Sequence, residues 1–236
     1  MDEGSVRDAA VGATRRGVSD DRSRPAPEVD PEVVAEIHSA LDPQRAARLS
    51  ERLASASAAL DRERFDEARR MVAPLVRELP QVAAVHEVNG LASYRTGRWR
   101  QAAQSLELAR QLKPDPTLLP VLADCYRAQK RWSDVEAVWG DVKAASPRHD
   151  VMAEARIVVA SSYADRGDLA AAIEVMQPSQ QAPKRVRTHH LRQWYVLADF
   201  YDRAGDTVSS TRWFQQIASC DPQFADVRER LRSLGR

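Results

Sequence analysis

Residues 191–222 read LRQWYVLADFYDRAGDTVSSTRWFQQIASCDP, and the fold of the chain can be inferred from this stretch. Its first half carries an apolar stripe at the i, i+3, i+4 and i+7 spacing of a helix, formed by Trp194, Leu197, Ala198 and Tyr201. Gly205 then provides a turn, and a second helical pattern runs through Ser210 and Phe214 to Pro222. The stretch therefore predicts two helices packed against each other as a hairpin.

The same layout recurs along the chain. Pro80, Pro114 and Pro147 are 34 and 33 positions apart, and a small or branched residue lies twelve positions before each: Ala68, Ala102 and Val135. The residues at the expected turns, where a left-handed backbone is common, are Gly97, Lys130, Gly167 and Gly205. Because strand-like alternation is nowhere sustained, the sequence predicts an all-α fold of stacked hairpins.

These repeats resemble the tetratricopeptide repeat (TPR) family, whose pattern of about 34 residues runs W-x2-L-G-x2-Y, then A-x3-F, then P. A second good copy consists of Leu119, Leu122, Ala123, Tyr126, Val135, Trp139 and Pro147. Three weaker copies keep Gly90, Trp99, Ala102, Leu106, Ala109 and Pro114; Ala160, Tyr163, Leu169, Ala172 and Met176; and Ala56, Ala59, Ala68, Val72 and Pro80. Residues 123–128 and 194–199 are similar to small actinobacterial TPR proteins that have no assigned activity.

The resemblance covers residues 49 to about 222 and implies a right-handed superhelix, an α-solenoid. Its five expected hairpins are residues 49–82, 83–115, 116–152, 153–190 and 191–222. One bulky position in each second helix is expected to fill the space beneath the following hairpin, at about 1.5–3 kcal/mol for each buried side chain. The residues at that position are Val72, Leu106, Trp139, Met176 and Phe214.

Both ends of the chain differ from the repeats. Residues 1–30 combine Gly, Ser, Pro and charges with few large apolar side chains, so we expect a disordered tail. Asp30-Pro31 is a helix-start signal and predicts a capping helix over residues 31–48, while residues 223–236 predict a polar final helix. The same signal recurs at Asp42-Pro43, Asp115-Pro116, Ser146-Pro147 and Asp221-Pro222. The long connection at residues 179–190 predicts an exposed loop.

Composition excludes several classes of protein. The 35 basic and 34 acidic residues leave a formal charge of +1, which gives no attraction of the whole molecule to nucleic acid or anionic lipid. The sequence has neither an apolar run long enough for a membrane helix nor a signal-peptide core, so we expect a cytoplasmic protein without a membrane partner. Cys125 and Cys220 are predicted to be buried, unpaired side chains.

No motif points to catalysis. The sequence contains neither a Gly-rich phosphate loop nor a G-x-S-x-G turn, and His86-Glu87 lacks the second histidine of a zinc hydrolase helix. Two adjacent histidines, His189 and His190, cannot both face one ion from a helix. We therefore expect no enzyme activity, no cofactor and no metal site.

The resemblance implies that a peptide or helix of a partner protein binds in a concave groove lined by the first helix of each repeat. The groove residues that we single out are Glu87, Tyr94, Arg95, Asp124, Arg127, Tyr195, Asp199, Asp202 and Arg203. Their mixed charge and tyrosines favour a partner with both charge signs and an apolar anchor. The alternative is that these side chains only pair with one another. Some TPR domains bind a C-terminal carboxylate through lysines and asparagines at fixed groove positions. This chain lacks them, because those positions are occupied by Glu87, Leu91, Pro120 and Asp124.

A second candidate surface is basic. Residues 183–192 carry +4 without an acid, through Lys184, Arg185, Arg187 and Arg192. One interpretation is that these residues contact RNA or a ribosome. The other is an ordinary solvated loop, which we favour because no aromatic residues that could stack on bases lie between the basic ones. Weak self-association through an imperfect end repeat is a third hypothesis.

Overall fold

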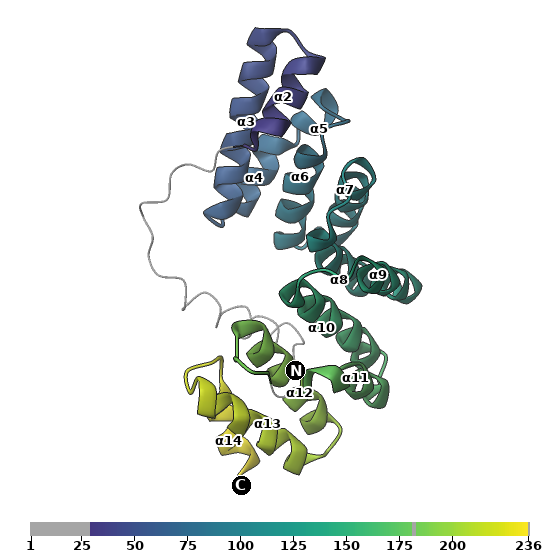
Figure 1. Ribbon diagram of the computed structural model, residues 1–236, viewed down its shortest axis with the longest axis vertical. Coiled ribbons are helices and arrows are strands. Elements are labelled where there is room, and N and C mark those ends of the chain that lie inside the picture. The colour runs from purple at the N-terminus through teal and green to yellow at the C-terminus, as the bar shows by residue number, and fades with distance from the viewer. Residues whose placement is uncertain (1–28, 181–182, 236) are drawn as a thin grey trace. The chain divides into compact units, whose positions relative to one another are not determined.

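The computed structural model describes residues 29–180 and 183–235, which form two compact units. The N-terminal unit comprises residues 29–145 and the C-terminal unit residues 146–235. In both units consecutive helices pair as hairpins, and in Figure 1 the hairpins follow one another in chain order within each unit. The described residues contain helices and turns but no strands, so the predicted all-α repeat fold is confirmed.

The N-terminal unit runs from α2 to α9. Its helices are α2 (Pro31–Ala40), α3 (Pro43–Asp61), α4 (Phe65–Val72), α5 (Leu75–Glu78), α6 (Ala83–Arg95), α7 (Trp99–Leu112), the 3-10 turn η1 (Pro116–Leu118), α8 (Leu119–Ala128) and α9 (Trp132–Ala145). Hairpins form from α3 with α4, α6 with α7, and α8 with α9. The first helices α3, α6 and α8 are also in contact in sequence order.

The C-terminal unit runs from α10 to α14. Its helices are α10 (His149–Asp165), α11 (Leu169–Val175), the 3-10 turn η2 (Gln177–Gln180), α12 (Thr188–Arg203), α13 (Thr207–Cys220) and α14 (Val227–Leu234). Hairpins form from α10 with α11 and α12 with α13, and α14 packs on α13. The predicted final helix is therefore present; Phe224, which precedes it, and Val227, its first residue, are both buried.

Five hairpin turns of the described chain share one backbone geometry. Gly97, Gly167 and Gly205 have φ values of 73°, 82° and 81°, and Lys130 has a φ of 58°, so the four expected turn positions are confirmed. Sequence analysis missed the fifth, Glu63, whose φ is 59°. In every case the next residue donates its N–H to a carbonyl five positions earlier, as in Arg64 N–H to Ala59 O at 2.8 Å. This bond closes the first helix and reverses the chain.

The cores follow the repeat pattern with one exception. Val72, Leu106, Met176 and Phe214 have no exposed surface, as expected for the bulky position. Trp139 is only partly buried, with the Lys143 ammonium 5.6 Å from its ring centre, and Val138 and Val142 turn inward on α9 instead. Cys125 is buried, but Cys220 is exposed at the end of α13, contrary to prediction.

Three of the five helix-start signals coincide with a helix start. Asp30, Asp42 and Asp115 each accept a backbone N–H through their side chains. The other two signals fail: Ser146 has a left-handed φ of 45° and α10 begins at His149, while Asp221 closes a turn that precedes α14. The expected boundaries after residues 48, 152 and 190 fall inside α3, α10 and α12.

Two expectations about irregular segments meet the described residues only in part. Residues 1–28 of the expected disordered tail lie outside the described residues, whereas Asp30 caps α2. The expected loop at residues 179–190 is shorter than predicted, because Ser179 is buried and α12 begins at Thr188. No helix of the described ranges is long and apolar enough to cross a membrane.

Candidate partner-binding face

Hydrogen bonds between first helices use several of the predicted groove residues. In the N-terminal unit the Tyr94 hydroxyl of α6 donates to Asp124 Oδ2 of α8 at 2.6 Å. Arg127 Nε donates to the other oxygen of Asp124 at 3.0 Å, and only 3% of Asp124 is exposed. A buried carboxylate needs such donors, because an unpaired one would be costly to desolvate. These three residues therefore join α6 to α8.

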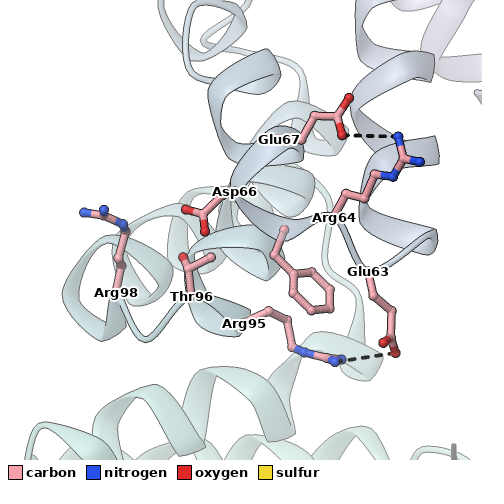
Figure 2. Close-up of a pocket in the computed structure, with 8 residues that line it drawn as sticks. Glu63, Arg64, Asp66, Glu67, Arg95, Thr96 and Arg98 are labelled. Atoms are coloured by element: carbon pink, nitrogen blue, oxygen red, sulfur yellow. Dashed lines mark ion pairs between the residues drawn. The ribbon is translucent and has the colours of Figure 1, made fainter.

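Arg95 lies at the end of α6, beside the turn of the preceding hairpin. Its guanidinium stacks 4.2 Å from the centre of the Phe65 ring and lies 3.8 Å from Glu63 Oε1. Figure 2 shows this region as an open pocket, with the Arg64–Glu67 pair on its other side at 3.6 Å. Its lining residues are Glu63, Arg64, Phe65, Asp66, Glu67, Arg95, Thr96 and Arg98. The pocket is polar and carries equal numbers of acids and arginines.

Glu87 stands apart from the other predicted residues of the N-terminal unit. It is partly buried on α6, and no hydrogen-bond or ion-pair partner reaches it from the described residues. Burial raises the pKa of its carboxyl group, and the neighbouring Asp115 raises that pKa further, while Lys113 opposes both. The Lys113 ammonium itself lies 3.4 Å from Glu32 Oε2.

In the C-terminal unit, three of the predicted groove residues form hydrogen bonds with α14 or with the residue before it. Tyr195 and Asp199 are 1% and 5% exposed, and burial raises the pKa of both side chains. The Tyr195 hydroxyl donates to Asp226, which directly precedes α14. Arg230 of α14 donates to Asp199 at 2.7 Å and to Asp202 at 3.2 Å. Tyr195 and Asp199 are therefore internal joints and not exposed contacts.

Arg203, the last of the predicted groove residues, is more exposed. Its Nη1 lies 3.9 Å from Asp199 Oδ2, and its Nη2 donates to the Ala164 carbonyl of α10 at 3.2 Å. It thus connects α12 to the end of the preceding first helix. The alternative that groove residues pair with one another describes this part of the chain well.

The structure separates the four basic residues of the predicted loop. Lys184, Arg185 and Arg187 are exposed, and no described acid forms an ion pair with them. Arg192 is instead paired with Glu154 of α10 at 2.7 Å. His190 Nδ1 accepts the backbone N–H of Arg187 at 2.9 Å and fixes the start of α12. The basic surface therefore consists of three side chains.

The contacts that Glu63, Phe65, Asp226 and Arg230 complete were not predicted from the sequence. A usable pattern was present, because Tyr94 and Asp124 are 30 residues apart and Tyr195 and Asp226 are 31 apart. This separation, close to one repeat length, brings neighbouring first helices together. In the described ranges no group of three or more His, Cys, Asp or Glu side chains is arranged to hold a metal ion.

Comparisons with known proteins agree with this geometry. Residues 53–117, from the middle of α3 to η1, match the family model described as tetratricopeptide repeat. The match supports the TPR family for this part of the chain. A crystal structure of a thermophilic TPR protein from Thermus thermophilus is similar to the chain, with a TM-score of 0.59 and 16% identity.

That similarity covers 79% of this chain and 98% of the Thermus chain. At 16% identity it shows the TPR fold and nothing about the partner. No protein of curated function matches the sequence. The resemblance to the TPR family is therefore confirmed, whereas the similarity to actinobacterial proteins stays a prediction.

Proposed function

We propose that this chain is a non-catalytic scaffold that binds a peptide or a helix of a partner protein on α6 and α8. Proteins of the TPR fold generally mediate protein–protein interaction and are generally not enzymes. The observation that carries the proposal is the mixed surface of these two first helices. Leu91 and Tyr94 are partly exposed and Arg95 and Ala128 are exposed, so apolar, aromatic and cationic contacts are available together.

The N-terminal unit is a better candidate than the last hairpin. Tyr94, Asp124 and Arg127 are held in one geometry before a partner arrives, which lowers the entropy lost on binding. In the last hairpin the corresponding polar groups are already occupied by α14. We therefore limit the proposed site to Glu87, Leu91, Tyr94, Arg95, Arg127 and Ala128.

A pair of identical substitutions tests the proposed face. Ala128→Arg puts a long charged side chain at the end of α8, whereas Ala137→Arg puts the same side chain on the second helix α9. Both alanines are exposed, so neither change should disturb the core. We expect full-length protein with Ala128→Arg to lose partners that it captures from nuclease-treated extract, and Ala137→Arg to retain them. Equal capture by both variants would contradict the proposed site.

A second candidate function is contact with RNA, because Lys184, Arg185 and Arg187 project from one short exposed segment. Changing all three to Gln should weaken binding to single-stranded RNA and reduce the slope of log K against log salt by about 2, at roughly 0.7 for each phosphate contact. The matched control changes the exposed Arg212, Arg228 and Arg232 to Gln. RNA binding that is absent, or equal in both triple variants, would eliminate this candidate.

We also propose that the protein acts in the cytoplasm and that it self-associates weakly. Both statements rest on the sequence. Sedimentation over a range of concentrations tests the second, and a single monomer mass at every concentration would remove it.

A further inference from the structure

Three carboxylates on first helices are comparable, two of them partly buried and the third fully buried. They are Glu87 on α6, Glu154 on α10 and Asp199 on α12, and burial is the largest cause of a raised pKa in each. Glu154 has Arg192 at 2.7 Å, and Asp199 has Arg230 at 2.7 Å. Both arginines come from the helix that follows in the stack, α12 and α14.

Glu87 has no such arginine among the described residues. The charged groups around it are Asp115, which adds negative charge, and Lys113, which belongs to the segment after α7. Lys113 is itself beside Glu32, and both of these side chains are more than half exposed, so their pair is weak. The carboxylate of Glu87 is thus partly desolvated without a close cation, an arrangement that disfavours the ionised form.

We propose that α6 selects partner segments that place a lysine or arginine side chain against Glu87, an inference that rests on the proposed protein-binding function. A cationic side chain of the partner would form with Glu87 the kind of ion pair that Arg192 forms with Glu154 and Arg230 forms with Asp199. An anionic partner group is disfavoured at this point, because it would face both Glu87 and Asp115. The basic residue serves as a specificity contact.

The residues that follow Glu87 on α6 define a second contact with the partner segment. Leu91 and Tyr94 follow Glu87 at i+4 and i+7, so the three side chains lie along one face of the helix. One helical turn rises about 5.4 Å, and an extended peptide spans about 3.3 Å per residue. A bound extended segment therefore places an apolar residue about two positions from its basic residue, against Leu91 and Tyr94.

Selection of peptides tests this inference on the full-length protein. A display library of random 12-residue peptides is passed over wild-type protein, Glu87→Gln and Glu36→Gln, where Glu36 is an exposed residue of α2. We expect wild type and Glu36→Gln to enrich peptides with Lys or Arg near an apolar residue, and Glu87→Gln to lose this enrichment. Glu87→Lys should enrich Asp or Glu instead.

The affinity of a selected peptide gives the quantitative test. Replacing its Lys by norleucine, or its Arg by citrulline, should weaken binding to wild type about tenfold and leave binding to Glu87→Gln unchanged, because one charge-assisted contact is lost. Peptides selected without a basic residue, or with one that Glu87→Gln retains, would overturn the inference and leave the proposed function standing. A library from which wild type selects nothing would contradict the proposed function itself.

Discussion

The two units differ in the partners of their buried and partly buried carboxylates. In the C-terminal unit, Arg230 from α14 holds Asp199 and Asp202, and Asp226 receives the hydroxyl of Tyr195. In the N-terminal unit, Tyr94 and Arg127 hold Asp124, but Glu87 has no partner among the described residues. The C-terminal segment of the last unit therefore pairs with the polar residues of the last hairpin, while Glu87 on α6 has no such cation among the described residues.

The turns differ as well. Both turns of the C-terminal unit use glycine at the left-handed position, whereas two of the three turns in the N-terminal unit use Glu63 and Lys130. A left-handed conformation costs a residue with a side chain about 1–2 kcal/mol, and glycine almost nothing. The hairpin turns of the N-terminal unit therefore contain backbone strain that the glycine turns avoid, although Ser146 and Ala225 of the C-terminal unit, outside its hairpin turns, are also left-handed. Three experiments test these two contrasts, and a fourth tests how closely the helices of a hairpin pack.

The largest effect is expected at the end of the C-terminal unit. Arg230→Ala leaves the buried Asp199 without its closest cation, and should lower the free energy of unfolding by about 3 kcal/mol. Arg232→Ala is the control, because Arg232 is exposed on the same helix. Urea unfolding measures both. Similar losses in the two variants would show that α14 does not depend on this contact.

The next effect tests how closely the helices of one hairpin approach. A Cβ atom on Gly90 would lie 2.7 Å from Leu106 Cγ, so Gly90→Ala should destabilise the protein by about 1–3 kcal/mol. Gly140 on α9 has no atom within 4 Å of the same position. Gly140→Ala should therefore stabilise the protein by up to about 1 kcal/mol through helix propensity. Urea midpoints that move in the same direction would contradict the packing of α6 on α7.

The contrast between the hairpin turns predicts that two substitutions change the stability of the protein in opposite directions. Lys130→Gly relieves a φ of 58° at an exposed position and should stabilise the protein by about 1 kcal/mol. Gly205→Ala imposes a side chain on a φ of 81° and should destabilise it by about the same amount. Thermal unfolding of the two variants checks the signs. A destabilised Lys130→Gly protein would mean that the lysine side chain has a role beyond the turn.

The smallest effect concerns Glu87 and depends on pH. Its pKa is raised in the folded protein, so at pH 7 the ionised carboxyl group opposes folding, and Glu87→Gln should be stabilising by about 0.5 kcal/mol. As the pH falls through the raised pKa, the folded protein takes up the proton and the penalty declines. Below the pKa of the unfolded chain, at about 4, the difference between Glu and Gln should vanish.

Urea unfolding of both proteins at pH 7 and at pH 3 provides this comparison. A destabilising Glu87→Gln change at pH 7 would show that Lys113 pairs with Glu87 in solution, and would weaken the case for a partner cation. Lys113→Gln in the same experiment identifies that pair directly.

Much of the fold could be predicted from local patterns. The stripe from Trp194 to Tyr201, the small residue Ala102 and the bulky Leu106 are governed by contacts within one hairpin or between neighbours. Such contacts recur once in every repeat, so the regular spacing of residues in the sequence is enough to predict them. Trp139 was predicted incorrectly because a degenerate copy allowed two registers on α9, and the valines filled the core.

The candidate site was less predictable. A groove position predicts where a residue lies on its helix, but not which other residue its side chain contacts. Tyr195 and Asp199 had the expected positions, but α14 covers them through Asp226 and Arg230. Arg192 was interpreted as part of a basic loop, although Glu154 of another helix neutralises it. These pairings depend on residues about 30 to 40 positions away, which no single repeat contains.

Local sequence is enough to specify the helical hairpins, their turns and most of their core, because the hydrophobic period and the turn residues act over short distances along the chain. Which charged side chains are satisfied internally, and which are left for another molecule, follows only from how the hairpins pack. Electrostatic pairing depends on distance in space and on burial, and both are fixed when one hairpin packs on the next.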